Sequence, residues 1–463
     1  MQVILRNLCL ITLLLSNFCL VQSCAVKAPP TGEDLQELAY ANFILPSTWQ
    51  NSADTTAVNN NWLDSFNDPV LDTLVKEALH YNPDLRISSA RIEEAIGYVE
   101  VAQAALRPAL SIFGRETTKL GGNLGGGLNG AIFEASWEID IWGKLRNARN
   151  AEQANLAVIK SQYSFARLSI AAHVTRTYFL ASSTFLQLQL AQQMVMSSEN
   201  LKTIAQHRFD IGTGTEIDVV IAKANLNQIK DAYKQLELAY SNQLRALELL
   251  LGRYPKAEIE VKNKLIELHS KIPNGIPLQI LERRPDVLAA QYQFNSSFYR
   301  VGEAKAARLP SLNITAGFGI IDSPLIQLSD DFSNPIRSLG GELIAPVYFG
   351  GQLKANVTIR TAQQKQAVEN YARTVLNAMA DVENTLDAVK NIEQRENYIF
   401  AATSSNKRAF ELEEIRFKVG KSDMRDLLDQ QMDLYKSETD LLHLQTQKII
   451  QRVNLFVALG GNM

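Results

Sequence analysis

The chain has 463 residues, 21% of them charged, and a formal net charge of −3. This balance excludes a basic nucleic-acid-binding face and indicates no strongly charged partner. Its five histidines are scattered, without the spacing of metal ligands and without a Ser/His/Asp or Cys/His grouping. We therefore expect no metal site, no cofactor and no enzymatic activity.

The N-terminus has the pattern of an export signal. Arg6 precedes an apolar core that is about half of the roughly 20 residues a membrane-spanning helix needs. The stretch "LVQSC" at 20–24 resembles a lipobox, which predicts a signal peptide over 1–23 and lipid attachment to Cys24. A plain secretory signal with an incidental Cys24 is the alternative. The segment 24–61, which contains prolines, is predicted to be a tether.

The rest of the chain is a duplication. Order and spacing are kept in pairs such as "NPDLRISSAR" at 82–91 with "RPDVLAAQYQ" at 284–293, and "RFDIG" at 208–212 with "RFKVG" at 416–420. We infer two repeats, 62–252 and 278–463, joined by an irregular connector over 253–277. Each repeat is predicted to contain a helix, two strands, a very long helix, a tight turn and a second long helix.

Two segments are free of proline and glycine over lengths that no globular core requires. They run from Lys144 to about His207 and from Gln352 to Lys418, and the first would extend roughly 95 Å as a helix. In the last helix, apolar residues recur every seven positions: Leu428, Tyr435, Leu442, Ile449 and Phe456. Such repeats predict helices packed side by side, forming a rod or a tube.

Four segments alternate apolar and polar residues, which predicts strands at about 109–120, 130–142, 311–321 and 337–349. Their length and alternation match the strands of outer-membrane barrels. A half-buried sheet in a soluble domain has the same periodicity and is the alternative, although the export signal favours a membrane location. The glycine-rich stretch 121–130 lacks the Gly-Lys-Ser/Thr ending of a phosphate-binding loop and is predicted to join two strands.

A sheet in lipid cannot leave an open edge, because every unpaired N–H or C=O group costs several kcal/mol there. Four strands cannot close by themselves. Two chains would give an eight-stranded barrel filled by side chains, whereas three chains would give twelve strands and a useful lumen. We therefore expect a homotrimer.

Two similar turns separate the long helices, "FDIGTGTEID" at 209–218 and "FKVGKSDMRD" at 417–426. Gly212, Gly214 and Gly420 are predicted to take the left-handed backbone that a helix reversal needs. The positions of Asp218 and Asp423 predict that their carboxylates cap the first turns of the returning helices.

These features resemble the outer membrane efflux proteins, the TolC/OprM-like channels, and among them the NodT-type lipoproteins. The resemblance covers nearly the whole mature chain and is carried by "WLDSFNDPVLDTLVKEAL" at 62–79, "WEIDIWGKLR" at 137–146, "IPLQILERRPDVLAAQ" at 276–291 and "VGEAKAARLPSL" at 301–312. It implies a mainly α fold with a transmembrane β-barrel: four strands per chain form a trimeric twelve-stranded barrel, which a long periplasmic α-helical barrel continues.

The same resemblance implies a passive exit duct of a tripartite efflux pump that exports small toxic compounds. Its partners would be a periplasmic adaptor protein, an inner-membrane pump of the RND or ABC type, and outer membrane lipid. The protein would be lipid-anchored in the outer membrane with a large periplasmic portion. A channel of the same fold for type I protein secretion and a lipid-anchored coiled-coil stalk are the alternatives.

The resemblance also implies where the duct closes. Asp426 and Asp429 match the acidic pair that lines the closed aperture of TolC-like channels. Asp218 and Phe417 are placed at the same periplasmic gate, although helix capping is the simpler role for Asp218. TolC has a Tyr and an Arg that hold neighbouring hairpins shut, whereas Phe417 and Ser422 stand here, so those locking bonds are not expected; Arg416 or Arg425 is the alternative candidate for that role. The candidate adaptor contacts are the turn residues Gly212, Gly214, Gly420 and Ser422.

Overall fold

The computed structural model describes residues 26–30, 32–39, 46–50, 62–115, 129–266, 277, 283–322 and 336–461. The predicted signal peptide, Cys24 and most of the glycine-rich stretch lie outside them. The chain divides into two compact units, which are described separately. Unit 1 comprises Met1–Phe43, Ala90–Ser161 and Leu288–Thr374, and unit 2 comprises Ile44–Ser89, Gln162–Val287 and Val375–Met463.

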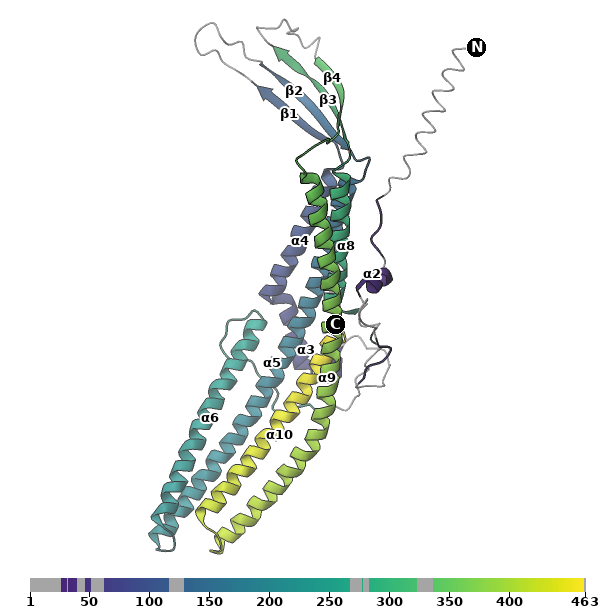
Figure 1. Cartoon of the computed structure of the whole chain (residues 1–463). Helices are drawn as coiled ribbons and strands as arrows, with labels where there is room; N and C mark the ends of the chain where they lie inside the picture. The colour runs from purple at the N-terminus through teal and green to yellow at the C-terminus, as the bar shows by residue number, and fades with distance from the viewer. Residues whose placement is uncertain are drawn as a thin grey trace, which may run out of the picture. The chain divides into compact units, whose positions relative to one another are not determined.

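Unit 1 contains an antiparallel four-stranded sheet in the order β1-β2-β3-β4 (Figure 1). The strands are β1 (Ala109–Arg115), β2 (Asn129–Ile139), β3 (Ser311–Asp322) and β4 (Ile336–Ile344). Within the described residues, β1 and β4 each pair on one side only, so both edges of the sheet are open. A short helix, α2 (Gly32–Ala39), lies within the predicted tether.

Two strands end earlier than the alternation predicts. β4 stops at Ile344, two residues before Pro346, because proline has no N–H to donate to a ladder. β2 stops at Ile139 because the next residue, Asp140, turns its carboxylate to the first N–H groups of the following helix. Alternation continues through both ends and therefore cannot mark where pairing stops.

The register of the sheet places most of the apolar residues of the four strands on one face, where Arg337, paired with Phe318, is an exception. Directly paired residues in an antiparallel sheet point to the same side. Paired rows include Ile112–Phe133–Phe318, Leu110–Ala135–Ala316–Leu339 and Ile139–Leu312–Leu343. The opposite face carries polar or small rows, including Ser111–Glu134–Gly317–Ser338 and Glu138–Asn313–Glu342, together with one mostly apolar row, Phe113–Ile132–Gly319–Ile336. The apolar face is uncovered, since Leu110 is 82% and Leu339 84% exposed.

Unit 2 contains the lower parts of two long helical hairpins (Figure 1). The first hairpin joins α5 (Lys144–Asp210) to α6 (Glu216–Leu250), and the second joins α9 (Gln352–Lys418) to α10 (Met424–Ala458). Every residue of the second hairpin lies 208 positions after its counterpart in the first, as the starts at Lys144 and Gln352 and at Glu216 and Met424 show. The duplication is therefore kept residue by residue through both helices and the turn.

Shorter helices complete the fold: η2 (Trp62–Phe66), α3 (Pro69–Tyr81), α4 (Pro83–Ala104) and α8 (Pro285–Ala306). In unit 2, η2 and α3 pack on α5, α6 and α10 around a core of aromatic and aliphatic side chains. Trp62 stacks on Phe456 with ring centroids 5.8 Å apart, and Phe66 contacts Phe179 at 5.5 Å. This core fixes the ends of the hairpins that lie far from the turns.

Candidate functional site

The two predicted hairpin turns have the same backbone geometry. Gly212 and Gly420 both have φ of +75°, and the N–H groups that follow them bond back to the carbonyls of Arg208 and Arg416. The left-handed prediction is confirmed for these two glycines and wrong for Gly214, whose φ lies outside that region. Gly214 is instead constrained by space, because an added Cβ would lie 2.9 Å from the Cβ of Arg208.

Both returning helices begin with side-chain caps. Thr215 caps α6 with its hydroxyl, and the Asp218 carboxylate accepts hydrogen bonds from the backbone N–H and hydroxyl of Thr215 at 3.0 and 2.8 Å. Asp423 caps α10 by accepting from the N–H of Asp426 at 2.9 Å. The Asp218 carboxylate is thus used within its own helix, which is the simpler of the two roles expected for it.

The two hairpins of one chain touch at their tips through Arg208 and Phe417. The Arg208 guanidinium lies over the Phe417 ring, 4.6 Å from its centroid, and donates to the Phe417 carbonyl at 3.3 Å. The ring itself is only 5% exposed. It belongs to a tip core built from both hairpins: Leu201, Ala205, Val219, Ala222, Phe417, Met424, Leu427 and Leu428. Sequence reasoning missed Arg208, although its place directly before the repeated Phe was a usable signal.

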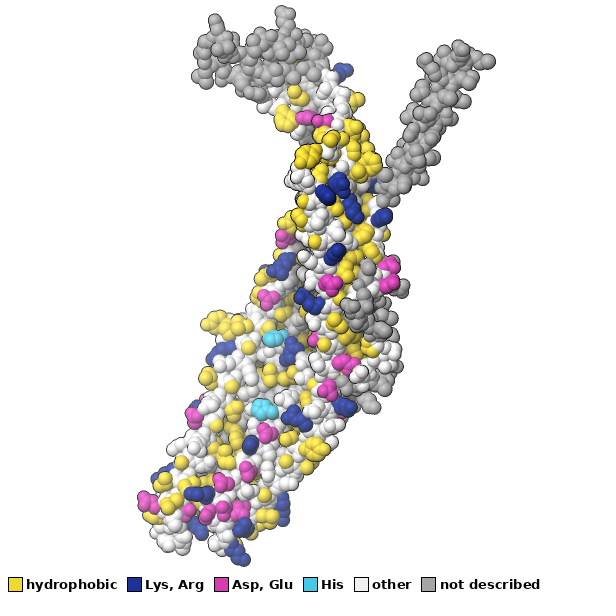
Figure 2. Space-filling view, viewed as in Figure 1, with side chains coloured by type: hydrophobic (Ala, Val, Ile, Leu, Met, Phe, Trp, Pro, Cys, Tyr) yellow, Lys and Arg dark blue, Asp and Glu magenta, His cyan; other side chains and the backbone are white. Residues whose placement is uncertain are grey.

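The predicted acidic pair lies at the start of α10. Asp426 and Asp429 are both exposed and, being three residues apart, share one side of the helix. No ion pair to either carboxylate is present in the described part of the chain; Asp426 accepts a hydrogen bond from Ser422 at 3.4 Å. The single hydroxyl hydrogen of Ser422 is shared with Glu413, which is the nearer acceptor, so Ser422 is bonded within its own hairpin. Acidic and basic side chains are mixed over the tips (Figure 2).

The "ERRPD" motif has a structural role that the sequence alone did not reveal. The Arg284 side chain is 6% exposed and bonds Asp286 at 2.7 and 3.0 Å, Asp381 at 3.1 Å, and the carbonyls of Ala378 and Ala458. Burial alone lowers the pKa of this guanidinium, but the two aspartates outweigh it and the pKa is raised. Arg284 therefore stays charged and ties the start of α8 to α9 and α10.

In the first repeat, a neutral side chain makes the corresponding contact between a short helix and the end of a hairpin. Asn82, before Pro83, donates to the carbonyl of Leu250 at 2.9 Å and accepts from the N–H groups of Asp84 and Leu85. Leu250 is the counterpart of Ala458, whose carbonyl Arg284 contacts. In both repeats the residue before the proline thus joins a short helix to the C-terminal end of a hairpin.

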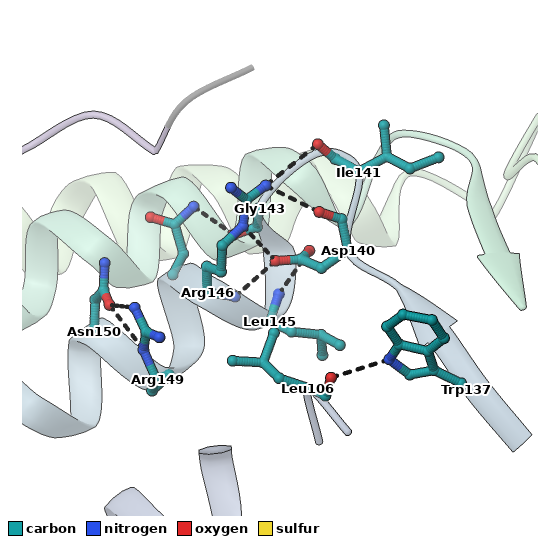
Figure 3. Close-up of polar contacts among 10 residues, drawn as sticks. Leu106, Trp137, Asp140, Ile141, Gly143, Leu145, Arg146, Arg149 and Asn150 are labelled. Carbon is teal, nitrogen blue, oxygen red and sulfur yellow. Dashed lines mark hydrogen bonds and ion pairs between the residues drawn. The ribbon is translucent and has the colours of Figure 1, made fainter. Parts of the chain in front are cut away.

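The "WEIDIWGKLR" motif forms the corner between β2 and α5 (Figure 3). Asp140 accepts from the N–H groups of Leu145 and Arg146 at 3.1 and 2.9 Å and from the Arg146 side chain at 3.0 Å. Gly143 has φ of +77°, which favours glycine. Two indole N–H groups bond loop carbonyls beside the sheet, Trp137 to Leu106 and Trp142 to Pro310. The motif sets the direction in which the helix leaves the strand.

The comparisons with known proteins agree with this architecture. The family model for outer membrane efflux proteins matches residues 74–253 and 276–461, one segment in each repeat. The chain belongs to the outer membrane efflux protein family. The pyoverdine export outer membrane protein OpmQ of Pseudomonas putida is 27% identical over 98% of this chain and 97% of its own. The cation efflux system protein CusC of Escherichia coli is 27% identical over 89% of this chain and 90% of its own.

Solved outer membrane channels share the fold. CmeC of Campylobacter jejuni superposes with a TM-score of 0.84 at 23% identity, covering 95% of this chain and 94% of that one. MtrE of Neisseria gonorrhoeae superposes with a TM-score of 0.80 at 24% identity, covering 94% of this chain and 97% of that one. The mainly α channel fold and the TolC/OprM-like family predicted from the sequence are confirmed. The protein is an outer membrane component of an efflux system.

Among the described residues, no helix is both long and apolar enough to cross a membrane. The same residues also contain no group of three or more His, Cys, Asp or Glu side chains arranged to hold a metal ion.

Proposed function

We propose that three copies of this chain form one passive conduit, with a shared twelve-stranded barrel in the outer membrane and a helical tube beneath it. The observation that carries this proposal is the sheet of unit 1, which has an apolar, uncovered face and two open edges within the described residues. Lipid can cover the face, but the edges can be satisfied only by strands of other copies.

We propose that the conduit receives small toxic compounds from a periplasmic adaptor and an inner-membrane pump of the RND or ABC type. Membership of the efflux family supports this arrangement, as do the names of relatives, which refer to pyoverdine export and cation efflux. The turns around Gly212 and Gly420 are the proposed adaptor contacts. Both glycines have open space where a Cβ would stand, so a partner's side chain could approach the backbone there.

The hairpin tips are the proposed gate. Asp426 and Asp429, copied threefold, would form a ring of six carboxylates at a narrow opening, where rings of one charge select ions. Phe417 contributes differently: with Arg208 it holds the two hairpins of one chain together. We do not assign Asp218 to the ring, because its carboxylate caps α6.

Replacing both Asp426 and Asp429 by Asn should reduce the cation selectivity of the conduit. A charge pair at 4 Å interacts by about 1 kcal/mol in bulk water, so losing six carboxylates should lower the cation-to-anion permeability ratio by roughly tenfold or more. Reversal potentials in planar bilayers under a salt gradient measure this ratio. The matched control is Glu411→Gln with Glu414→Gln, which removes two exposed carboxylates, also three residues apart, that pair with Arg408 and Lys418.

Equal ratios for the acidic-pair variant and the control would reject the gate assignment. A protein that is monomeric in detergent by native mass spectrometry, or that never conducts, would reject the conduit itself.

We further propose that Cys24 carries the lipid anchor. The lipobox-like "LVQSC" supports this, as does a relative, the probable outer membrane lipoprotein SilC of Salmonella typhimurium, which is 27% identical over 88% of this chain. Cells fed an alkyne-bearing palmitate should incorporate it into the wild-type protein and not into Cys24→Ser. Label retained by Cys24→Ser would place the lipid elsewhere, and an unlabelled wild type would favour a plain secretory signal.

A further inference from the structure

The two hairpins of one chain contact each other through α5 and α10, with further contacts between α6 and α10 and, at the tip, between α5 and α9. Thr446 donates to Ser183 at 2.7 Å, and Gln431 donates to Ser197 at 2.7 Å. At the tip, Arg208 lies over Phe417. We call this set of contacts the inner seam. In Figure 1 the hairpin helices follow the order α6, α5, α10, α9 across the view, so α6 and α9 lie at its two sides.

Helices α6 and α9 are the repeat counterparts of α10 and α5. Because the two hairpins correspond at a shift of 208, α9 is the copy of α5, and α6 is the copy of α10. Some side chains that are buried at or beside the inner seam have exposed counterparts, whereas Leu427 and its counterpart Val219 are both buried. Leu428 is 4% exposed, whereas its counterpart Val220 is 58% exposed. Thr446 is 2% exposed, whereas its counterpart Leu238 is 61% exposed.

The tips show the same difference. Phe417 is 5% exposed beneath Arg208, whereas its counterpart Phe209 is 42% exposed. The counterpart of Arg208 is Arg416, whose side chain is 58% exposed. One copy of the Arg–Phe pair is thus assembled inside the chain, and the two members of the other copy lie on its surface.

We propose that Arg416 of one subunit stacks on Phe209 of the neighbouring subunit, and that α9 and the neighbour's α6 form an outer seam that repeats the inner one. This inference rests on the proposed trimer and adds to it the residues that join subunits at the tips. Six hairpin tips would then be held by six equivalent Arg–Phe contacts, three within chains and three between them.

The chemistry of Arg416 suits this contact. Its guanidinium bonds Glu413 at 2.9 Å, and Glu413 is 7% exposed and also accepts from Ser422. Hydrogen bonds to a guanidinium lie in its plane, so both flat faces remain available to an aromatic ring within about 6 Å. Glu413 would therefore position Arg416 for the neighbour's ring instead of competing with it.

Photo-crosslinking of the purified trimer tests the proposal. With Phe209 replaced by benzoylphenylalanine, irradiation should join subunits into covalent dimers and trimers on denaturing gels, and peptide mapping should place the link within 409–420. The matched control is the same replacement at Phe417, which should link within its own chain and leave the monomer band in place.

The unmodified protein gives a second measurement. At the inner seam, Gln431 forms hydrogen bonds with Ser197 and Ser198. Lys223 is the counterpart of Gln431, and Lys407 lies next to the counterparts of the two serines. An amine-reactive crosslinker should therefore join Lys223 of one subunit to Lys407 of the next. Links from Phe209 and Lys223 to these α9 segments support the outer seam. An intact trimer whose links map elsewhere, or that forms none, overturns it. Absence of a trimer by native mass spectrometry would instead reject the proposed function.

Discussion

Replacing Arg284 by alanine is expected to destabilise the helical part of the protein by about 3 kcal/mol. Removing one partner of a buried ion pair costs about 3–5 kcal/mol, and the lower end applies because Asp381 keeps 57% of its side chain exposed. The substitution would also leave the carbonyls of Ala378 and Ala458 without the guanidinium. At 1.4 kcal/mol per factor of ten, the ratio of folded to unfolded protein should fall roughly a hundredfold.

Thermal unfolding of the protein in detergent, followed by far-UV circular dichroism, would show this loss as a lower midpoint. Arg284→Lys keeps the charge but lacks the planar fork, so an intermediate midpoint is expected. The control is Arg408→Ala, which removes a surface pair with Glu411 and should change stability by at most about 0.5 kcal/mol. An unchanged midpoint for Arg284→Ala would mean that this network contributes nothing measurable to the fold.

Replacing Leu339 by arginine should block assembly of the barrel. Leu339 lies in the middle of β4, on the apolar face, and is 84% exposed. An arginine facing lipid at the middle of the membrane costs about 2–4 kcal/mol in a β-barrel, and a trimer would carry three of them. We expect little folded trimer in the outer membrane fraction.

The adjacent residue provides the control. Ser338 pairs with Gly317 on the opposite, polar face, which would line the lumen. Ser338→Arg adds the same charge one position away and should leave most of the trimer intact. Both variants can be scored by the amount of heat-modifiable trimer in outer membrane fractions. Equal assembly of the two would show that the apolar face does not meet lipid.

Much of this architecture could be predicted because the long helices, the strands and the tight turns each follow from a local pattern in the sequence. The second long helix was expected from Gln352 to Lys418 and has those bounds, since nothing inside it interrupts helical hydrogen bonding. The strands were expected from alternation, and the register confirms that their apolar faces coincide. Gly420 was expected to be left-handed because a reversal between two helices leaves few other conformations.

The contacts between distant segments were not predictable in the same way. Nothing local to "ERRPD" indicates that its second arginine reaches Asp381 and Ala458, because those partners are adjacent only after the helices pack. The repeated Arg–Phe dipeptide likewise appears identical in both copies of the sequence. Only the packing of hairpin on hairpin buries Phe417 and leaves Phe209 at the surface.

The sequence by itself determined the duplicated plan, the four strands, the long helices and the family, because periodicity, glycine placement and motif order are properties of the chain read along its length. The tertiary structure alone decided which copy of each repeated residue is buried and which side chains hold the helices together. The physical reason is that two similar repeats packed within one chain must each turn one side inward and the other outward. Local sequence does not specify that choice.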